Sequence, residues 1–167
     1  MRRIGIAVAV LVGVIAMGVA GAYGHEVAVL DDCDPNDSTW EDIGGCALPK
    51  GEVTRAEFDD ELLSPDATTV IGHQAWRNDP AYLKIRSRAT VHVKNKGGRD
   101  HTFTEVAEFG GGIVPPLNVG LTPAPECDNA DILPPGASMR LGDLDPGNHR
   151  FQCCLHPWMR TLIKVLD

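Results

Sequence analysis

The sequence has little positive charge. Its 167 residues include 15 Lys and Arg against 23 Asp and Glu, which gives a formal net charge of −8. Because a protein that neutralises phosphates needs a basic face, this balance argues against nucleic-acid binding. The chain also lacks internal repeats, low-complexity segments and the strong charge bias of disordered proteins. We therefore expect one folded domain.

The N-terminus has the pattern of an export signal. Arg2 and Arg3 precede an apolar run from Ile4 to Ala20, and the small residues Gly21, Ala22 and Gly24 follow. This order is typical of a secretory signal peptide, so residues 1–24 are predicted to be removed. An uncleaved membrane anchor is the alternative, because the run is just long enough to span a bilayer. Without the signal the chain carries a net charge of −10. We expect it to be periplasmic or extracellular, free of the membrane, in a compartment that permits disulfides.

Residues 25–79 are acidic and rich in turn-forming residues. They predict an irregular N-terminal extension that packs on the domain or flanks it. A short helix is expected from Thr54 to Leu63, because Thr54 can cap it and Phe58 and Leu62 have helical spacing.

Residues 80–167 have the pattern of a β-rich domain. Leu83 and Ile85 alternate with charged residues, as do Val91 and Val93, which is typical of half-buried strands. Further strands are expected at 102–106, 138–144, 150–154 and 161–166, with Gly- and Pro-containing turns between them. Short strands at such spacing indicate an all-β sandwich or barrel.

One short segment combines a thiol, an imidazole and a thioether. Cys153, His156 and Met159 follow one another at intervals of three residues, between two predicted strands. A tight turn at that spacing can bring all three side chains to one point. His101, at the start of another predicted strand, can add a second imidazole. Two His and one Cys with a weak axial Met form the ligand set of blue-copper electron-transfer sites, so the sequence predicts a copper site.

The same residues carry a family resemblance. The motif Cys153-x-x-His156-x-x-Met159, with Pro157 inside it and His101 upstream, resembles the cupredoxins. The short loop is most similar to that of amicyanin, and plastocyanin and pseudoazurin are relatives with longer loops. The resemblance implies an eight-stranded Greek-key β-sandwich that binds one type 1 copper ion. It further implies that His101, Cys153 and His156 are equatorial ligands and that Met159 is the axial ligand.

Other metal centres fit the sequence less well. A dinuclear purple copper centre needs two thiolates separated by three residues, whereas Cys153 and Cys154 are adjacent and should point to opposite sides of a strand. Multicopper oxidases and copper nitrite reductases need further His ligands. The chain has six His, and none of them flanks Cys153. The Cys-x-x-Cys-His sequence of a c-type haem is absent.

The copper assignment explains the odd number of cysteines. With Cys153 as a ligand, Cys33, Cys46, Cys127 and Cys154 remain, an even set with three pairings. We favour Cys33–Cys46, which closes a local loop. The second pair, Cys127–Cys154, would tie a long connection to the strand beside the site.

These observations predict a monomeric electron carrier and not an enzyme. The exposed edge of His156, rimmed by Pro157, Trp158 and residues 114–117, is the expected electron port. The acidic surface suits a basic redox partner such as a cytochrome. The alternatives are a periplasmic or extracellular copper carrier or buffer that binds Cu(I) without electron transfer, and a metal-free module of the same fold.

Overall fold

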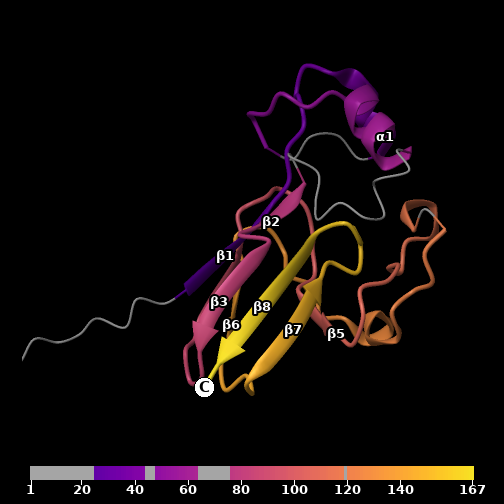
Figure 1. Ribbon diagram of the computed structural model, residues 1–167. Coiled ribbons are helices and arrows are strands. Elements are labelled where there is room, and N and C mark those ends of the chain that lie inside the picture. Colours follow the sequence, from indigo (N-terminus) through magenta and orange to yellow (C-terminus); the bar gives the residue numbers. More distant parts are fainter. Residues whose placement is uncertain (1–24, 44–47, 64–75, 119) are drawn as a thin grey trace, which may run out of the picture.

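The strands form a β-sandwich (Figure 1). The structure is a computed structural model that describes residues 25–43, 48–63, 76–118 and 120–167. Within these ranges the strands form two four-stranded sheets, with orders β2-β1-β4-β6 and β3-β8-β7-β5. The strands are β1 (His25–Leu30), β2 (Arg77–Asp79), β3 (Tyr82–Arg86), β4 (Val91–Asn95), β5 (Thr104–Val106), β6 (Ser138–Leu141), β7 (Gly147–Gln152) and β8 (Arg160–Leu166). The predicted all-β sandwich is confirmed, and each strand predicted after Pro80 is present.

Alternating side chains build the core between the two sheets. Successive residues of a strand point to opposite faces, so the apolar residues of each strand can all face inward. Val27 and Val93, which are neighbours in the parallel β1–β4 pair, are fully buried. Phe103 and Phe151 stack with ring centroids 4.8 Å apart. Other buried members of this core include Val29, Val91, Ile85, Ile163 and Val165.

The N-terminal segment contributes strands to the sandwich. β1 pairs with β4 on one side and with β2 on the other, so it is an interior strand of its sheet. The expectation of an irregular segment over residues 25–79 is therefore wrong at β1 and β2. β1 does alternate, with Val27 and Val29 buried, but its parallel partner lies more than sixty positions away. A pairing of that separation leaves no local signal in the sequence.

The predicted helix is present and packs at the end of the sandwich. α1 spans Arg55–Leu63. Thr54 and Glu57 form a capping box: the Thr54 N–H donates to Glu57 Oε2 at 2.9 Å, and the Glu57 N–H donates to Thr54 Oγ1 at 3.2 Å. Figure 1 shows α1 at the end of the sandwich where the chain passes from β7 to β8, opposite the C-terminus. The shorter helices are η1 (Ser38–Ile43), η2 (Pro115–Leu117) and η3 (Pro125–Asn129).

A disulfide ties η3 to Cys154, the second residue after β7. Cys127 and Cys154 are bonded, as predicted, and both are buried. Their sequence separation of 27 residues implies about 3.5 kcal/mol of stabilisation in the chain-entropy account. The predicted Cys33–Cys46 pair lies outside the described residues because Cys46 is not among them, and so does the predicted signal at 1–24. In the part of the chain that the structure describes, no helix is both long and apolar enough to cross a bilayer.

His149 links β7 to β5 at the edge of the second sheet. Its Nδ1 lies 2.6 Å from Glu105 Oε1, and its Nε2 lies 2.7 Å from the Asp145 carbonyl oxygen. Both neighbours are acceptors, so both ring nitrogens are satisfied only when the imidazole is protonated. Partial burial opposes this charge, but the hydrogen bonds to Asp145 and Glu105 raise the pKa of His149 above its usual 6.5.

We expect the stability of the metal-free protein to fall with rising pH partly through His149. A His whose pKa is higher in the folded state stabilises fully below pH 6.5, and this contribution is lost as the pH passes the folded pKa. Urea unfolding between about pH 6 and about pH 9 measures the effect. The His149→Gln variant should lose less stability over that range than the parent protein. Equal losses would contradict this account.

Candidate metal centre

The loop between β7 and β8 carries most of the predicted ligands. β7 and β8 are antiparallel neighbours, with Gln152 opposite Arg160, and residues 153–159 connect them. The Cys153 N–H donates to the Met159 carbonyl at 2.9 Å, and the Met159 N–H donates to the His156 carbonyl at 2.9 Å. These two bonds close the loop, so Cys153 and Met159 face each other across its base and His156 stands at its turn.

Three of the four predicted ligands converge on one point. Cys153 Sγ lies 3.7 Å from His101 Nδ1 and 3.6 Å from His156 Nδ1, and the two Nδ1 atoms are 3.2 Å apart. Cys153 and His101 are fully buried, and His156 is half-buried. Met159 is also fully buried on the same loop. Its function as an axial ligand stays a prediction.

Neighbouring groups fix the positions of His101 and Cys153. The backbone of His101 forms a two-bond bridge with Leu133, at 3.2 and 2.7 Å. The Thr102 N–H points at Cys153 Sγ, 3.4 Å away, and the Thr102 hydroxyl oxygen accepts from the Cys154 N–H at 2.7 Å. Thr102, the residue next to His101, therefore contacts both the Cys153 sulfur and the Cys154 N–H. Cys153 points to the ligand group and Cys154 to the disulfide, as expected for adjacent residues of an extended chain.

Asp31, which was not predicted from the sequence, lies behind the His101 ring. Its Oδ2 lies 2.8 Å from His101 Nε2, and both side chains are buried. The other ring nitrogen, Nδ1, is thereby left facing Cys153. Asp31 follows β1 directly, so the unexpected strand is what carries it to the site. In the sequence Asp31 is one of several neighbouring acidic residues, and nothing sets it apart from them.

The electrostatics of the group favour a thiolate. Burial by itself would raise the pKa of the Cys153 thiol, but the neighbouring imidazoles of His156 and His101 hold that pKa well below its usual value. Burial would likewise lower the pKa of His101, yet its hydrogen bonds to Asp31 and Cys153 raise it to about 9. Because a thiolate is the form of cysteine that binds metals, the two imidazoles favour the binding form of the sulfur.

The ligand atoms fit a single metal ion. Nitrogen and sulfur ligands at about 2.0 to 2.3 Å from one ion lie about 3.2 to 3.8 Å from each other at roughly trigonal angles. The three separations, 3.2, 3.6 and 3.7 Å, fall in that range. A soft thiolate with two imidazoles suits copper in both of its common oxidation states. His101, Cys153 and His156 could therefore hold one copper ion.

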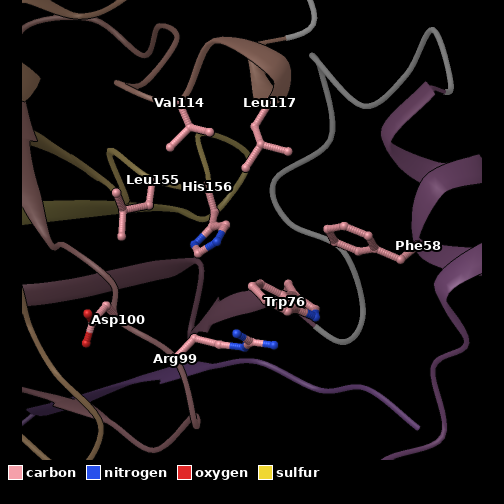
Figure 2. Close-up of a pocket in the computed structure, with 8 residues that line it drawn as sticks. All are labelled: Phe58, Trp76, Arg99, Asp100, Val114, Leu117, Leu155 and His156. Carbon is pink, nitrogen blue, oxygen red and sulfur yellow. The ribbon is translucent and has the colours of Figure 1, made fainter. Parts of the chain in front are cut away.

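Aromatic rings surround His156. The ring centroids of Trp76 and Trp158 lie 4.8 and 5.5 Å from that of His156. Figure 2 shows the His156 ring facing Trp76, with Phe58 projecting from the helix side. His156, Trp76 and Phe58 border a cavity of about 510 Å³, which is also lined by Arg99, Asp100, Val114, Leu117 and Leu155.

The predicted rim of His156 needs one correction. Pro157 and Trp158 were expected at the exposed rim, but both are buried. Trp158 packs against Phe58 of α1, with ring centroids 5.7 Å apart, so the N-terminal segment covers it. Val114 and Leu117 do border the cavity beside His156, as predicted. Phe58 and Trp76 were missed as rim residues, because their proximity arises only from the packing of the N-terminal segment.

Gly112 allows close contact beside the ligand loop. The N–H of the next residue, Ile113, donates to the Cys154 carbonyl oxygen at 2.8 Å. A Cβ atom at Gly112 would lie 2.0 Å from that same oxygen, which is closer than real contacts allow. The strand end that carries Cys153 and Cys154 therefore requires glycine at this position.

We expect Gly112→Ala to disturb both stability and the metal centre. The added methyl group must push away the Cys154 backbone, and Cys153 is attached to it. Thermal unfolding and the stoichiometry of bound copper measure the two effects, with losses predicted in both. Gly142→Ala is a suitable control, because a Cβ there meets nothing within 4 Å. Parent-like behaviour of Gly112→Ala would contradict the close contact.

The chain was compared with known protein families, sequences and structures. No family model matches the chain, and no curated protein matches its sequence. A solved structure of a purple cupredoxin from Nitrosopumilus maritimus is 13% identical, with a TM-score of 0.47, and the match covers 85% of this chain and 99% of that one. Amicyanin from Paracoccus versutus is 18% identical, with a TM-score of 0.39, over 58% of this chain and 79% of its own. In its two-sheet β-sandwich and its His101, Cys153 and His156 group, the chain resembles the cupredoxins.

Proposed function

We propose that this chain is an exported, mononuclear type 1 copper protein that transfers single electrons. The observation that carries the proposal is the buried group of His101 Nδ1, Cys153 Sγ and His156 Nδ1, within 3.7 Å of one another. Copper held there would supply one-electron chemistry by alternating between Cu(II) and Cu(I). The protein would transform no substrate of its own.

The residues of the chain would keep the coordination similar in both oxidation states. Two loop hydrogen bonds, from the Cys153 N–H and the Met159 N–H, hold the ligand loop on rigid strands. His101 is fixed through its backbone and through Nε2. A centre that moves little on reduction needs little reorganisation, which favours rapid electron transfer. Met159, buried at the base of the loop, is proposed as the axial ligand that tunes the potential.

Burial of the ligands supports electron transfer in preference to catalysis at the metal. Cys153, His101 and Met159 are 0% exposed, so these three side chains have no contact with bulk water. His156 is the half-buried member of the group. We propose that electrons pass through its ring, where Val114, Leu117 and Leu155 offer a small apolar contact surface (Figure 2). Contacts of this kind suit transient redox encounters.

Two features support export. Residues 1–24 have the pattern of a signal peptide. The Cys127–Cys154 disulfide agrees with an oxidising compartment such as the periplasm or the exterior. We propose that the exported chain acts as a monomer and meets its redox partner there.

The colour of the copper-loaded protein tests the proposed function. With Cu(II) bound, the protein should develop an intense visible charge-transfer band and narrow copper hyperfine splitting, because both arise from a thiolate ligand. Cys153→Ser should abolish the band. The double variant Cys127→Ser with Cys154→Ser should retain it, since neither sulfur faces the site. A colourless protein that takes up only Cu(I) would overturn electron transfer and favour a copper carrier or buffer.

The charge of the chain predicts the salt dependence of its electron transfer. Without its signal the chain has a net charge of −10, so a basic partner should be attracted over long distances. The association rate with a basic cytochrome, measured by stopped-flow absorbance, should fall as the ionic strength rises. A neutral redox reagent of small size is the control and should show little change. A salt-independent rate with the cytochrome would refute the proposed steering.

A further inference from the structure

We infer that Asp31 is a positioning residue of the metal centre, whose carboxylate directs His101 Nδ1 to the metal and stabilises Cu(II) relative to Cu(I). This inference rests on the proposed function. It concerns a residue outside the predicted ligand set, delivered by the N-terminal strand β1.

The hydrogen bond between His101 and Asp31 determines which ring nitrogen faces the metal. Asp31 Oδ2 lies 2.8 Å from His101 Nε2, and His101 is fully buried. A carboxylate accepts hydrogen bonds, so Nε2 carries the hydrogen. When a metal replaces the proton on Nδ1, the lone pair of that nitrogen lies on the side of the ring that faces Cys153 Sγ. Carboxylate–histidine–metal arrangements fix both the tautomer and the orientation of a ligating ring in this way.

The carboxylate is itself held in place. The Gly98 N–H donates to Asp31 Oδ1 at 2.8 Å, and the Arg99 N–H donates to Oδ2 at 2.9 Å. A Cβ atom at Gly97 would lie 2.2 Å from Oδ2, so the backbone of this turn packs directly on the carboxylate. The turn is fixed by Asn95, whose side chain donates to the Arg99 and Leu133 carbonyl oxygens. Asp31 therefore cannot rotate away from His101 without breaking the turn.

The negative charge of Asp31 should favour Cu(II) over Cu(I). Asp31 is 7% exposed, so water screens its carboxylate poorly. A negative charge behind a ligating imidazole increases the electron donation of the ring. It also attracts a doubly charged ion more strongly than a singly charged one. A purely structural residue would weaken the binding of both oxidation states alike, whereas Asp31 should act mainly on Cu(II).

The test compares Asp31→Asn with Glu26→Gln. Both variants remove one carboxylate from the same stretch of chain, but Glu26 is exposed and pairs with Lys96. Affinities for Cu(II) and Cu(I) are measured separately by competition with chelators, together with the reduction potential. Asp31→Asn should bind Cu(II) about 10 to 100 times more weakly, with a smaller change for Cu(I). Each tenfold change in the ratio of the two affinities raises the potential by about 59 mV. Glu26→Gln should match the parent protein.

The outcomes separate the inference from the function on which it rests. An equal loss of both affinities in Asp31→Asn, or an equal shift in Glu26→Gln, would overturn the inference. A parent protein that shows no charge-transfer band would instead refute the proposed function.

A second measurement uses the parent protein, so it tests the inference even if Asp31→Asn does not fold. Long-range proton–nitrogen NMR spectra of the Cu(I) protein should show His101 protonated at Nε2 and metal-bound at Nδ1. The opposite arrangement would overturn the inference.

Discussion

The buried sulfur of Cys153 is the constraint on which the rest of the site depends, because a thiolate in a protein interior must be compensated. Cys153 is 0% exposed. An isolated charge at such a depth is costly unless it is paired and hydrogen-bonded. Two imidazoles and the Thr102 N–H surround the sulfur. The His101 ring is balanced in turn by Asp31, and the Asp31 carboxylate by the N–H groups of Gly98 and Arg99. This chain of contacts runs from the ligand loop to β1 and to the turn after β4, so both sheets contribute to it.

The N-terminal segment therefore belongs to the metal centre. β1 places Asp31 behind His101, and α1 places Phe58 over Trp158. Trp76, just before β2, lies against the His156 ring. A domain beginning at Pro80 would have His101, Cys153 and His156 but would lose these three neighbours. The segment covers the site, and its strands β1 and β2 form half of one of the two sheets.

The sequence was sufficient for the ligand loop and insufficient for its surroundings. Cys153 and His156 share one short turn, so their convergence follows from spacing alone, and His101 lies at the start of a recognisable strand. Asp31 acts 70 positions away from His101, among several other acidic residues, and no local pattern distinguishes it. Trp158 was expected at the surface. It is buried because Phe58, from a helix distant in the sequence, packs against it. The parallel pairs β1–β4 and β3–β8 likewise join segments that are distant in the sequence, so their pairing could not be predicted from local patterns.

The proposed centre holds one copper ion on the sulfur of Cys153 and the imidazoles of His101 and His156 in both oxidation states. X-ray absorption at the copper edge, recorded on the oxidised and the reduced protein, measures the ligands of each state directly. The account predicts one sulfur at short distance and two imidazole nitrogens in both spectra, with little change in the metal–ligand distances. Loss of an imidazole on reduction, or a second short sulfur ligand, would contradict it.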